Sequence, residues 1–181
     1  MTSPRPSLFA RSLCALATAA CTLATLAAEP ASSSGFSAGL SVQPTATAAD
    51  IGLPLYPGAK PWRESGDEGP GATLALWGGA FGMQLKALKL RTPDKVDDVA
   101  RYYRDAMAHY GKVVDCSAGA PREPEPARRD DSTLRCGSGD KPPAGAQHYK
   151  VGAPRAMRIV TVEPVAGGTQ VQLVYLQIRG E

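Results

Sequence analysis

The sequence contains few of the residues that most often carry chemistry. Its 181 residues include only two histidines, His109 and His148, and four cysteines. Their spacings do not match a zinc site, which needs more ligands than these residues supply, so we expect no metal. The sequence also lacks a Gly-x-Ser-x-Gly elbow, a Walker-type loop and a His-Glu-x-x-His motif. We therefore expect no cofactor, assign no catalytic residue and do not favour an enzyme.

The chain also lacks a strong charge of either sign. Its 20 basic and 17 acidic side chains leave a formal net charge of +3 at pH 7. Removal of Arg5 and Arg11 with an N-terminal signal would bring the balance closer to zero. Proteins that bind nucleic acid usually carry a basic surface, so we expect no nucleic-acid partner.

The N-terminus has the pattern of a secretory signal. Arg5 and Arg11 precede an uncharged apolar stretch over residues 12–28, and small residues stand before Glu29. This combination predicts export. The stretch is short for a membrane span and is diluted by Ala and Thr. We assign residues 1–28 to the signal, with an uncleaved anchor as the alternative.

Cys21 leaves two processing routes open. It follows Thr18-Ala-Ala and so resembles the cysteine of a bacterial lipoprotein signal, although Thr18 stands where such signals usually have Leu. Lipidation of Cys21 would hold the protein at the outer membrane through the anchor alone. Cleavage near Ala27 or Ala28 would instead release a soluble periplasmic or secreted protein.

The remaining cysteines predict a disulfide. Cys14 lies within the signal, so Cys116 and Cys136 are the only free thiols of a mature chain processed by either route. Two cysteines in an oxidising compartment usually pair. The chain-entropy account gives such a bridge about 3 kcal/mol of stabilisation. Two separate buried thiols are the alternative.

The rest of the chain divides into a tether and a single domain. Residues 29–50 are rich in Ser, Ala, Thr, Gly and Pro and contain few large apolar side chains. Such a segment buries too little apolar surface to offset the entropy of ordering it. We therefore predict a flexible tether over 29–50 and one folded domain over 51–181.

A proline-rich segment, residues 53–59, opens the predicted domain. Pro54 and Pro57 lack backbone donors, which excludes a central strand. We expect Leu53 and Tyr56, with the neighbouring Leu55, to anchor this segment onto the domain. A binding loop that uses Tyr56 is the alternative.

Two strands are expected next, over residues 73–77 and 81–91, joined by a turn at Gly78–Ala80. The second strand changes phase, because its alternating apolar positions shift by one residue between Ala87 and Leu88. A β-bulge there would return the later residues to the buried face. Burial of the later half on both faces is the alternative.

The clearest predicted element is an amphipathic helix. Thr92 is a suitable N-cap, Pro93 suits the first helical position and Gly111 suits the stop. We expect Asp97 and Arg101 to pair on the polar face. Apolar residues recur at helical spacing at Val96, Val99, Ala100, Tyr103, Ala106, Met107 and Tyr110.

The C-terminal third is expected to be mainly β-structure. Short strands are predicted at 112–116, 132–136 and 148–152, followed by a hairpin around Gly167-Gly168. The order is therefore ββ-α-β(β)-ββ. We predict an α+β fold, in which one long helix packs on one face of an antiparallel sheet of about five to seven strands.

The segment Tyr56-Pro-Gly-Ala and the helix motif Val99-Ala-Arg-Tyr-Tyr, which ends at Gly111, together resemble a set of small exported bacterial proteins. Many of these are described as lipoproteins, and their functions are unassigned. The resemblance covers residues 53–116. It implies an exported protein with one helix on a sheet, and it assigns no catalytic residue.

Few other residues are candidates for a site. His109 and Asp105 are spaced to meet on the helix surface, where a surface pair is favoured over a catalytic base. His148 has no partner that the sequence identifies, and Asp130-Asp131 is expected to be a solvated loop. Of the aromatic residues Trp62 and Trp77, we expect one to be exposed and one to lie in the core.

Three functional hypotheses follow. The first is a non-enzymatic envelope protein, structural or interacting, that contacts another envelope protein through its sheet edge or loops. The second is a domain that binds a small molecule or lipid in a pocket between helix and sheet. The third is a hydrolase whose active site has no local signature.

Overall fold

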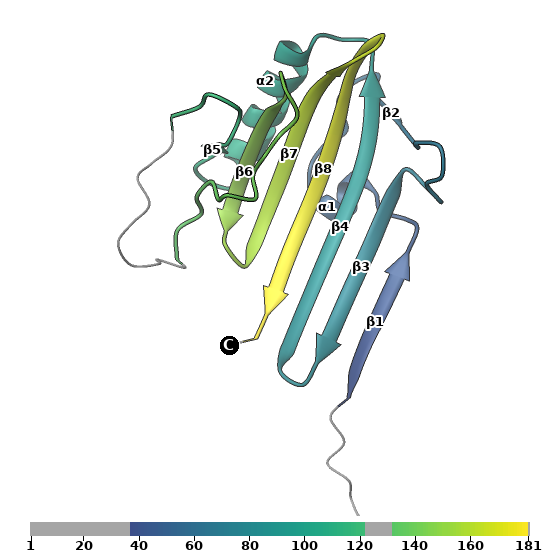
Figure 1. Cartoon of the computed structure of the whole chain (residues 1–181), viewed down its shortest axis with the longest axis vertical. Helices are drawn as coiled ribbons and strands as arrows, with labels where there is room; N and C mark the ends of the chain where they lie inside the picture. Colours follow the sequence, from purple (N-terminus) through teal and green to yellow (C-terminus); the bar gives the residue numbers. More distant parts are fainter. Residues whose placement is uncertain (1–36, 122–131, 181) are drawn as a thin grey trace, which may run out of the picture. The chain divides into compact units, whose positions relative to one another are not determined.

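The computed structural model describes residues 37–121 and 132–180, all within the compact unit Gly35–Glu181. Cys14, Cys21 and the Asp130-Asp131 pair lie outside the described residues. The unit is an antiparallel sheet with two short helices (Figure 1). Its elements are β1 (Ala38–Gln43), α1 (Ala48–Ile51), β2 (Lys60–Pro61), β3 (Gly71–Gly78), β4 (Phe81–Thr92), α2 (Val96–Ala108), β5 (Val114–Asp115), β6 (Gln147–Ala153), β7 (Ala156–Val165) and β8 (Gly168–Arg179).

The sheet is built around two long central strands. Its order is β1-β3-β4-β8-β7-β6-β5, with every neighbouring pair antiparallel. β2 pairs with β4 where Lys60 lies opposite Arg91, beyond the end of β3. β4 and β8 each contain 12 residues and pair without interruption from Gly82–Arg179 to Thr92–Thr169. Within the described residues, no helix is long and apolar enough to cross a membrane.

The predicted fold is wrong in its balance of strand and helix. The sheet has eight strands rather than five to seven, and the helical part is two short helices of 4 and 13 residues rather than one long helix. The additional strands β1 and β2 contain Gly, Ser or Pro, so their composition gives little indication of a strand. Their stability comes from pairing with β3 and β4, which are distant in the sequence.

The main helix begins later than the sequence predicts. Thr92 is not its N-cap but the last residue of β4, where it pairs with Thr169. The hydroxyl of Thr169 donates a 2.6 Å hydrogen bond to the carbonyl of Asp94, which holds this stretch against the sheet. The helix therefore starts at Val96, with Lys95 as an N-cap that makes no side-chain cap bond.

The end of α2 and its polar face also differ in detail from the prediction. α2 ends at Ala108, and Gly111 follows with a φ of 129°, as expected of a helix stop. Arg101 pairs with Asp98 at 3.2 Å instead of with Asp97. The Asp97 carboxylate accepts a 2.8 Å hydrogen bond from the side chain of Gln147 on β6. The expected Asp97–Arg101 pair within the helix is thus replaced by a hydrogen bond between α2 and β6.

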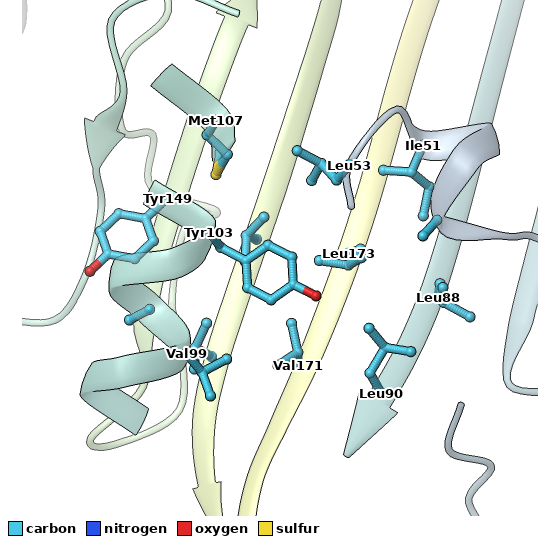
Figure 2. Packing of buried hydrophobic residues seen from close by; sticks show 14 of the residues in the cluster. Ile51, Leu53, Leu88, Leu90, Val99, Tyr103, Met107, Tyr149, Val171 and Leu173 are labelled. Carbon is cyan, nitrogen blue, oxygen red and sulfur yellow. The ribbon is translucent and has the colours of Figure 1, made fainter. Parts of the chain in front are cut away.

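The hydrophobic core lies between the helices and one face of the sheet. Figure 2 shows side chains of α2 directed at those of the central strands. Val99, Tyr103 and Met107 are fully buried, as the predicted stripe requires. The sheet residues of this cluster are Leu88, Leu90, Tyr149, Val151, Val160, Val162, Val171 and Leu173.

Residues 38–51, most of which the sequence assigns to the tether, form β1 and α1. β1 pairs along β3, with Leu40 opposite Leu76. α1 has a capping box, in which the Thr47 side chain accepts from the Asp50 backbone while the Asp50 carboxylate accepts from the Thr47 backbone. Ile51 is 1% exposed and joins the core. A short helix thus closes one end of the core ahead of the proline-rich segment.

The proline-rich segment 53–59 lies against α2. Leu53 is buried, whereas Leu55 is exposed. The Tyr56 backbone donates to the Tyr103 hydroxyl at 3.2 Å, and the Tyr102 hydroxyl donates to the Leu55 carbonyl at 2.9 Å. The rings of Tyr56 and Tyr102 meet edge to face, with centroids 5.1 Å apart. The structure therefore agrees with an anchoring role for this segment.

The change of phase in β4 does not come from a bulge, because its pairing with β8 is continuous across Ala87 and Leu88. Leu88 and Leu90 are buried under the helices. Lys89 and Arg91 point to the opposite face and are partly covered by residues 62–67. The structure therefore agrees better with the alternative, in which the later half of β4 is covered on both faces, than with a bulge.

The C-terminal third is largely as predicted. β7 and β8 form the expected hairpin, β6 includes the whole predicted strand at 148–152, and β5 lies within the predicted strand at 112–116. Residues 132–136 are irregular instead of forming a strand. This segment is held by side chains and a disulfide rather than by a ladder of backbone hydrogen bonds.

Candidate functional site

The two faces of the sheet are covered differently. We call the side that carries α1 and α2 the helix face and the opposite side the far face. Side chains along a strand alternate between faces, so Leu88 points to the helix face and Leu85 to the far face. We call the end of the sheet at the β3–β4 turn, Gly79–Ala80, the hairpin end. In Figure 1 both helices lie behind the sheet, and the hairpin end is at the bottom.

An apolar surface, which we name the apolar patch, occupies the hairpin end of the far face. It extends over β1, β3, β4, β8 and β7, which are consecutive neighbours in the sheet. No member carries a charge. Leu40 and Val42 are 64% and 63% exposed, and Phe81 is 45% exposed. The patch consists of Leu40, Val42, Leu74, Leu76, Phe81, Met83, Leu85, Met157, Ile159, Val174, Leu176 and Ile178.

The helix face of β4 and β8 is polar at this end of the sheet. Gln84 and Lys86 alternate with the patch residues of β4, and Gln177 and Arg179 alternate with those of β8. The hairpin end therefore has its apolar side on the far face, whereas the other end has its apolar side under the helices. The described residues cover the second apolar surface but leave the first open to solvent.

A charged segment borders the patch beside β4. The Lys89 ammonium lies 3.2 Å from both Glu64 and Asp67, and the Arg91 guanidinium stacks 3.8 Å above the Trp62 ring. Burial alone would lower the pKa of Lys89, but the hydrogen bonds to Asp67 and Glu64 outweigh it and raise that pKa. Residues 62–67 thus cover the far face of β4 where the apolar residues end.

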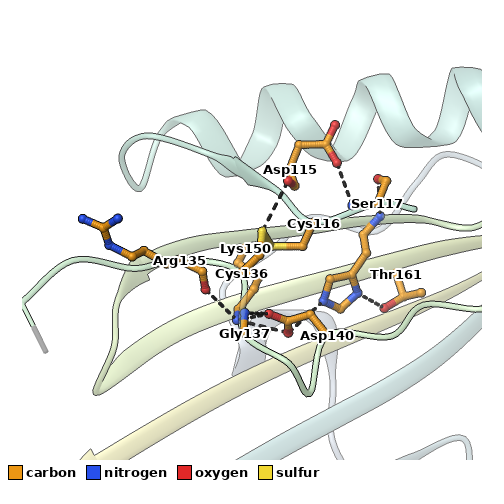
Figure 3. Close-up of polar contacts among 10 residues, drawn as sticks. Asp115, Cys116, Ser117, Arg135, Cys136, Gly137, Asp140, Lys150 and Thr161 are labelled. Atoms are coloured by element: carbon orange, nitrogen blue, oxygen red, sulfur yellow. Dashed lines mark hydrogen bonds and ion pairs between the residues drawn. A yellow bond between two sulfur atoms is a disulfide. The ribbon is translucent and has the colours of Figure 1, made fainter. Parts of the chain in front are cut away.

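Residues 132–140, which we name the disulfide loop, border the patch on the opposite side. Cys116 and Cys136 are bonded, which confirms the predicted pair and indicates an oxidising, non-cytoplasmic environment. Figure 3 shows Lys150 of β6 reaching into this loop. Its ammonium donates to the Asp140 carboxylate at 2.9 Å and to the Arg135 carbonyl at 3.2 Å. The loop is therefore held over the far face of β6 by a covalent bond and by a largely buried ion pair.

His148 lies beside this ion pair. Its Nδ1 is 2.9 Å from the Thr161 hydroxyl, and its Nε2 is buried 3.6 Å from an Asp140 oxygen. Burial lowers the pKa of His148, and attraction by Asp140 only partly opposes this. Burial would raise the pKa of Asp140, but hydrogen bonds from Lys150 and from the Gly137 backbone hold it below its usual value. The group is a packed structural cluster in which His148 is largely shielded from solvent.

The same region contains the closest grouping of metal-ligand residue types in the described part of the chain. Ligand atoms of Cys116, Cys136 and Asp140 lie within 4.8 Å of one another. Both sulfurs are joined in the disulfide, and metal ligation requires thiolates. The Asp140 carboxylate is also bonded to Lys150. The arrangement thus serves to hold the loop.

His109 and Asp105 lie at a shallow open hollow of about 520 Å³ on the outer side of α2. The proline-rich segment forms its opposite wall at Gly52 and Pro54, and Tyr110 closes one side. Within the described ranges, no hydrogen bond or ion pair connects Asp105 to His109. This geometry does not orient His109 as a base.

The predicted pocket between helix and sheet is not found among the described residues, because fully buried Val99, Tyr103 and Met107 fill that space. A second hollow, of about 310 Å³, adjoins the apolar patch instead. Its lining includes Val42, Ala87 and the segment at residues 66–72. Both of these hollows are open to solvent.

The two tryptophans are both at least partly exposed, at 36% for Trp62 and 47% for Trp77. The prediction that one would be in the core is wrong. Trp77 lies across Gly39 of β1, where a Cβ would approach the indole to 2.3 Å. Its ring covers the helix face of β1 and β3, and that face carries no helix there.

The sequence analysis did not identify the apolar patch, Asp140 or Lys150. The alternation of Met83 and Leu85 with Gln84 was visible, but nothing in the sequence indicated which side of the sheet the helices cover. Comparisons of the chain with known protein families, curated proteins and solved structures gave no match.

Proposed function

We propose that this protein is an exported, non-enzymatic module of the cell envelope that binds its partner through the apolar patch. The observation that carries the proposal is a charge-free surface formed by five adjacent strands and left open by the described residues. Soluble monomers rarely expose contiguous apolar patches larger than a few hundred Å², and those that do generally use them for binding.

The composition of the strands supports a binding role for this surface. At the hairpin end of β4 and β8, polar residues such as Gln84 and Gln177 lie on the helix face, and Leu85 and Leu176 are paired on the far face. If both faces of the sheet were in water at this end, placing the apolar side chains on one face would not stabilise it. The pattern is that of a sheet with one covered face, and the described chain does not supply the cover.

We place the protein in the periplasm or attached to the outer membrane. The signal pattern of residues 1–28 and the Cys116–Cys136 disulfide support export. Mass spectrometry of the chain expressed with its own N-terminus tests the route. A lipid-modified chain that starts at Cys21 indicates an anchored protein, and a chain that starts near Glu29 indicates a released one. An unprocessed cytoplasmic chain would overturn the assignment to the envelope.

Site-specific photo-crosslinking in intact cells tests the binding surface. A photoreactive amino acid replaces Leu85 in the patch, and the matched control replaces its neighbour Gln84 on the helix face. We expect protein adducts from position 85 and few or none from position 84. Equal labelling from both positions, or no adduct from position 85, would refute the patch as the contact surface.

A further inference from the structure

We infer that the apolar patch is covered by a second copy of this chain, packed face to face about a two-fold axis. This inference rests on the proposed function, because it names the partner for the same surface. Three properties of the patch support it: its lack of charge, its charged borders and its size.

The lack of charge restricts the partner. Within the patch there is no side chain that could form an ion pair, so affinity and alignment must come from apolar packing. A two-fold dimer places the same surface on both sides of an interface. Each Leu or Ile then meets an apolar side chain, and no charge is buried without a partner.

The borders restrict the outline of the partner. Lys89 with Glu64 and Asp67 limits the patch along β4, and Lys150 with Asp140 limits it along β6. A second copy presents an apolar area of the same size, bounded by the same polar segments.

The size of the patch suits a pair of packed sheets. Five strands spaced about 4.8 Å apart span about 19 Å, and Phe81 to Ala87 of β4 spans about 20 Å. The resulting plane is on the order of 400 Å², and projecting side chains increase its accessible area. Standard interfaces bury about 800 Å² per partner. Two such sheets pack about 10 Å apart, as in β-sandwiches.

Sedimentation of the exported chain, purified with its own N-terminus, tests the inference. Leu176→Glu introduces a charge in the middle of the patch, and Gln177→Glu introduces the same charge on the helix face of the same strand. Leu40→Glu repeats the change on the edge strand β1, where the side chain is already 64% exposed and the fold is least at risk. Circular dichroism verifies that each variant is folded.

We expect the wild-type chain to sediment at twice the monomer mass at micromolar concentration. Leu176→Glu and Leu40→Glu should return it to the monomer mass, and Gln177→Glu should remain dimeric. A photoreactive residue at position 85 should then give an adduct of two chains. A wild-type monomer, or a dimer unaffected by Leu40→Glu, would overturn the inference.

The remaining outcomes distinguish this inference from the proposed function. A monomer that forms position-85 adducts with another protein would refute the dimer and retain the binding surface. A monomer that sediments with phosphatidylethanolamine–phosphatidylglycerol vesicles, and loses this property in Leu176→Glu, would assign the patch to a membrane. A patch covered by the chain's own N-terminal residues would give a monomer without adducts, and both proposals would then fail.

Discussion

The Lys150 ammonium lies 2.9 Å from the Asp140 carboxylate, and the two side chains are only 10% and 13% exposed. Breaking a largely buried pair leaves a charge without its partner. Lys150→Met should therefore lower the free energy of unfolding by about 2 kcal/mol, measured by urea denaturation at pH 7. Lys150→Met with Asp140→Asn should recover part of this loss. Equal stability of the single variant and the wild type would show that the pair contributes nothing.

The disulfide should contribute a comparable amount. It joins cysteines 20 residues apart in the sequence, and its second cysteine lies in the disulfide loop that carries Asp140. Replacing both Cys116 and Cys136 by Ser should lower the free energy of unfolding by about 3 kcal/mol. A reducing agent should destabilise the wild type by a similar amount and leave the double variant unchanged. If the reductant also destabilised the double variant, its effect would not come from the disulfide.

The buried histidine predicts a pH dependence of stability. The pKa of folded His148 lies below its usual value of 6.5 because burial disfavours the charged ring. As the pH falls below about 6.5, the unfolded chain binds a proton that the folded chain does not. The free energy of unfolding should therefore decrease from pH 7 toward the folded pKa. Asp140, whose pKa is lowered, retains its contribution until the pH falls below about 4.

Chemical denaturation between pH 7 and 5 measures this effect. His148→Gln should flatten the decrease, because it removes the titrating ring. His109→Gln changes an exposed histidine at the end of α2 and should leave the contribution of His148 in place. If His148→Gln had the same pH profile of stability as the wild type, the decrease could not be attributed to His148.

Tyr103 should be the most sensitive position of α2. Its ring is fully buried, and its hydroxyl accepts the backbone hydrogen bond of Tyr56. Tyr103→Ala should lower the free energy of unfolding by about 3–5 kcal/mol by leaving a cavity. Tyr103→Phe retains the ring and should cost about 1 kcal/mol through the unpaired backbone group. Thermal and urea unfolding measure the stability of both variants. Equal losses of stability would show that the ring does not contribute more than the hydroxyl.

Much of the chain order could be predicted from the sequence, because local patterns determine it. The apolar stripe of α2 and the turn glycines of the terminal hairpin are such patterns, and both elements occur where expected. The start of α2 could not be predicted correctly, because Thr92 and Pro93 form a good capping sequence in isolation. Pairing of Thr92 with Thr169 and the bond to Asp94 override that preference.

The candidate site was harder to predict because it depends on where the helices lie. The phase change at Ala87–Leu88 is visible in the sequence, but a bulge and burial on both faces explain it equally well. The structure shows that the apolar side of the sheet itself changes face along the strand. Similarly, Asp140 and Lys150 are brought together by the disulfide loop, and no spacing in the sequence indicates that contact.

The change of face along β4 also protects the sheet against misregistration. If β4 slipped by one residue against β8, Leu88 and Leu90 would turn away from α2, and Gln84 and Lys86 would turn into the apolar patch. Both apolar surfaces would be lost in the same error. A chain that has formed its core in the correct register has therefore also formed its apolar patch, so a copy with this register error has neither surface.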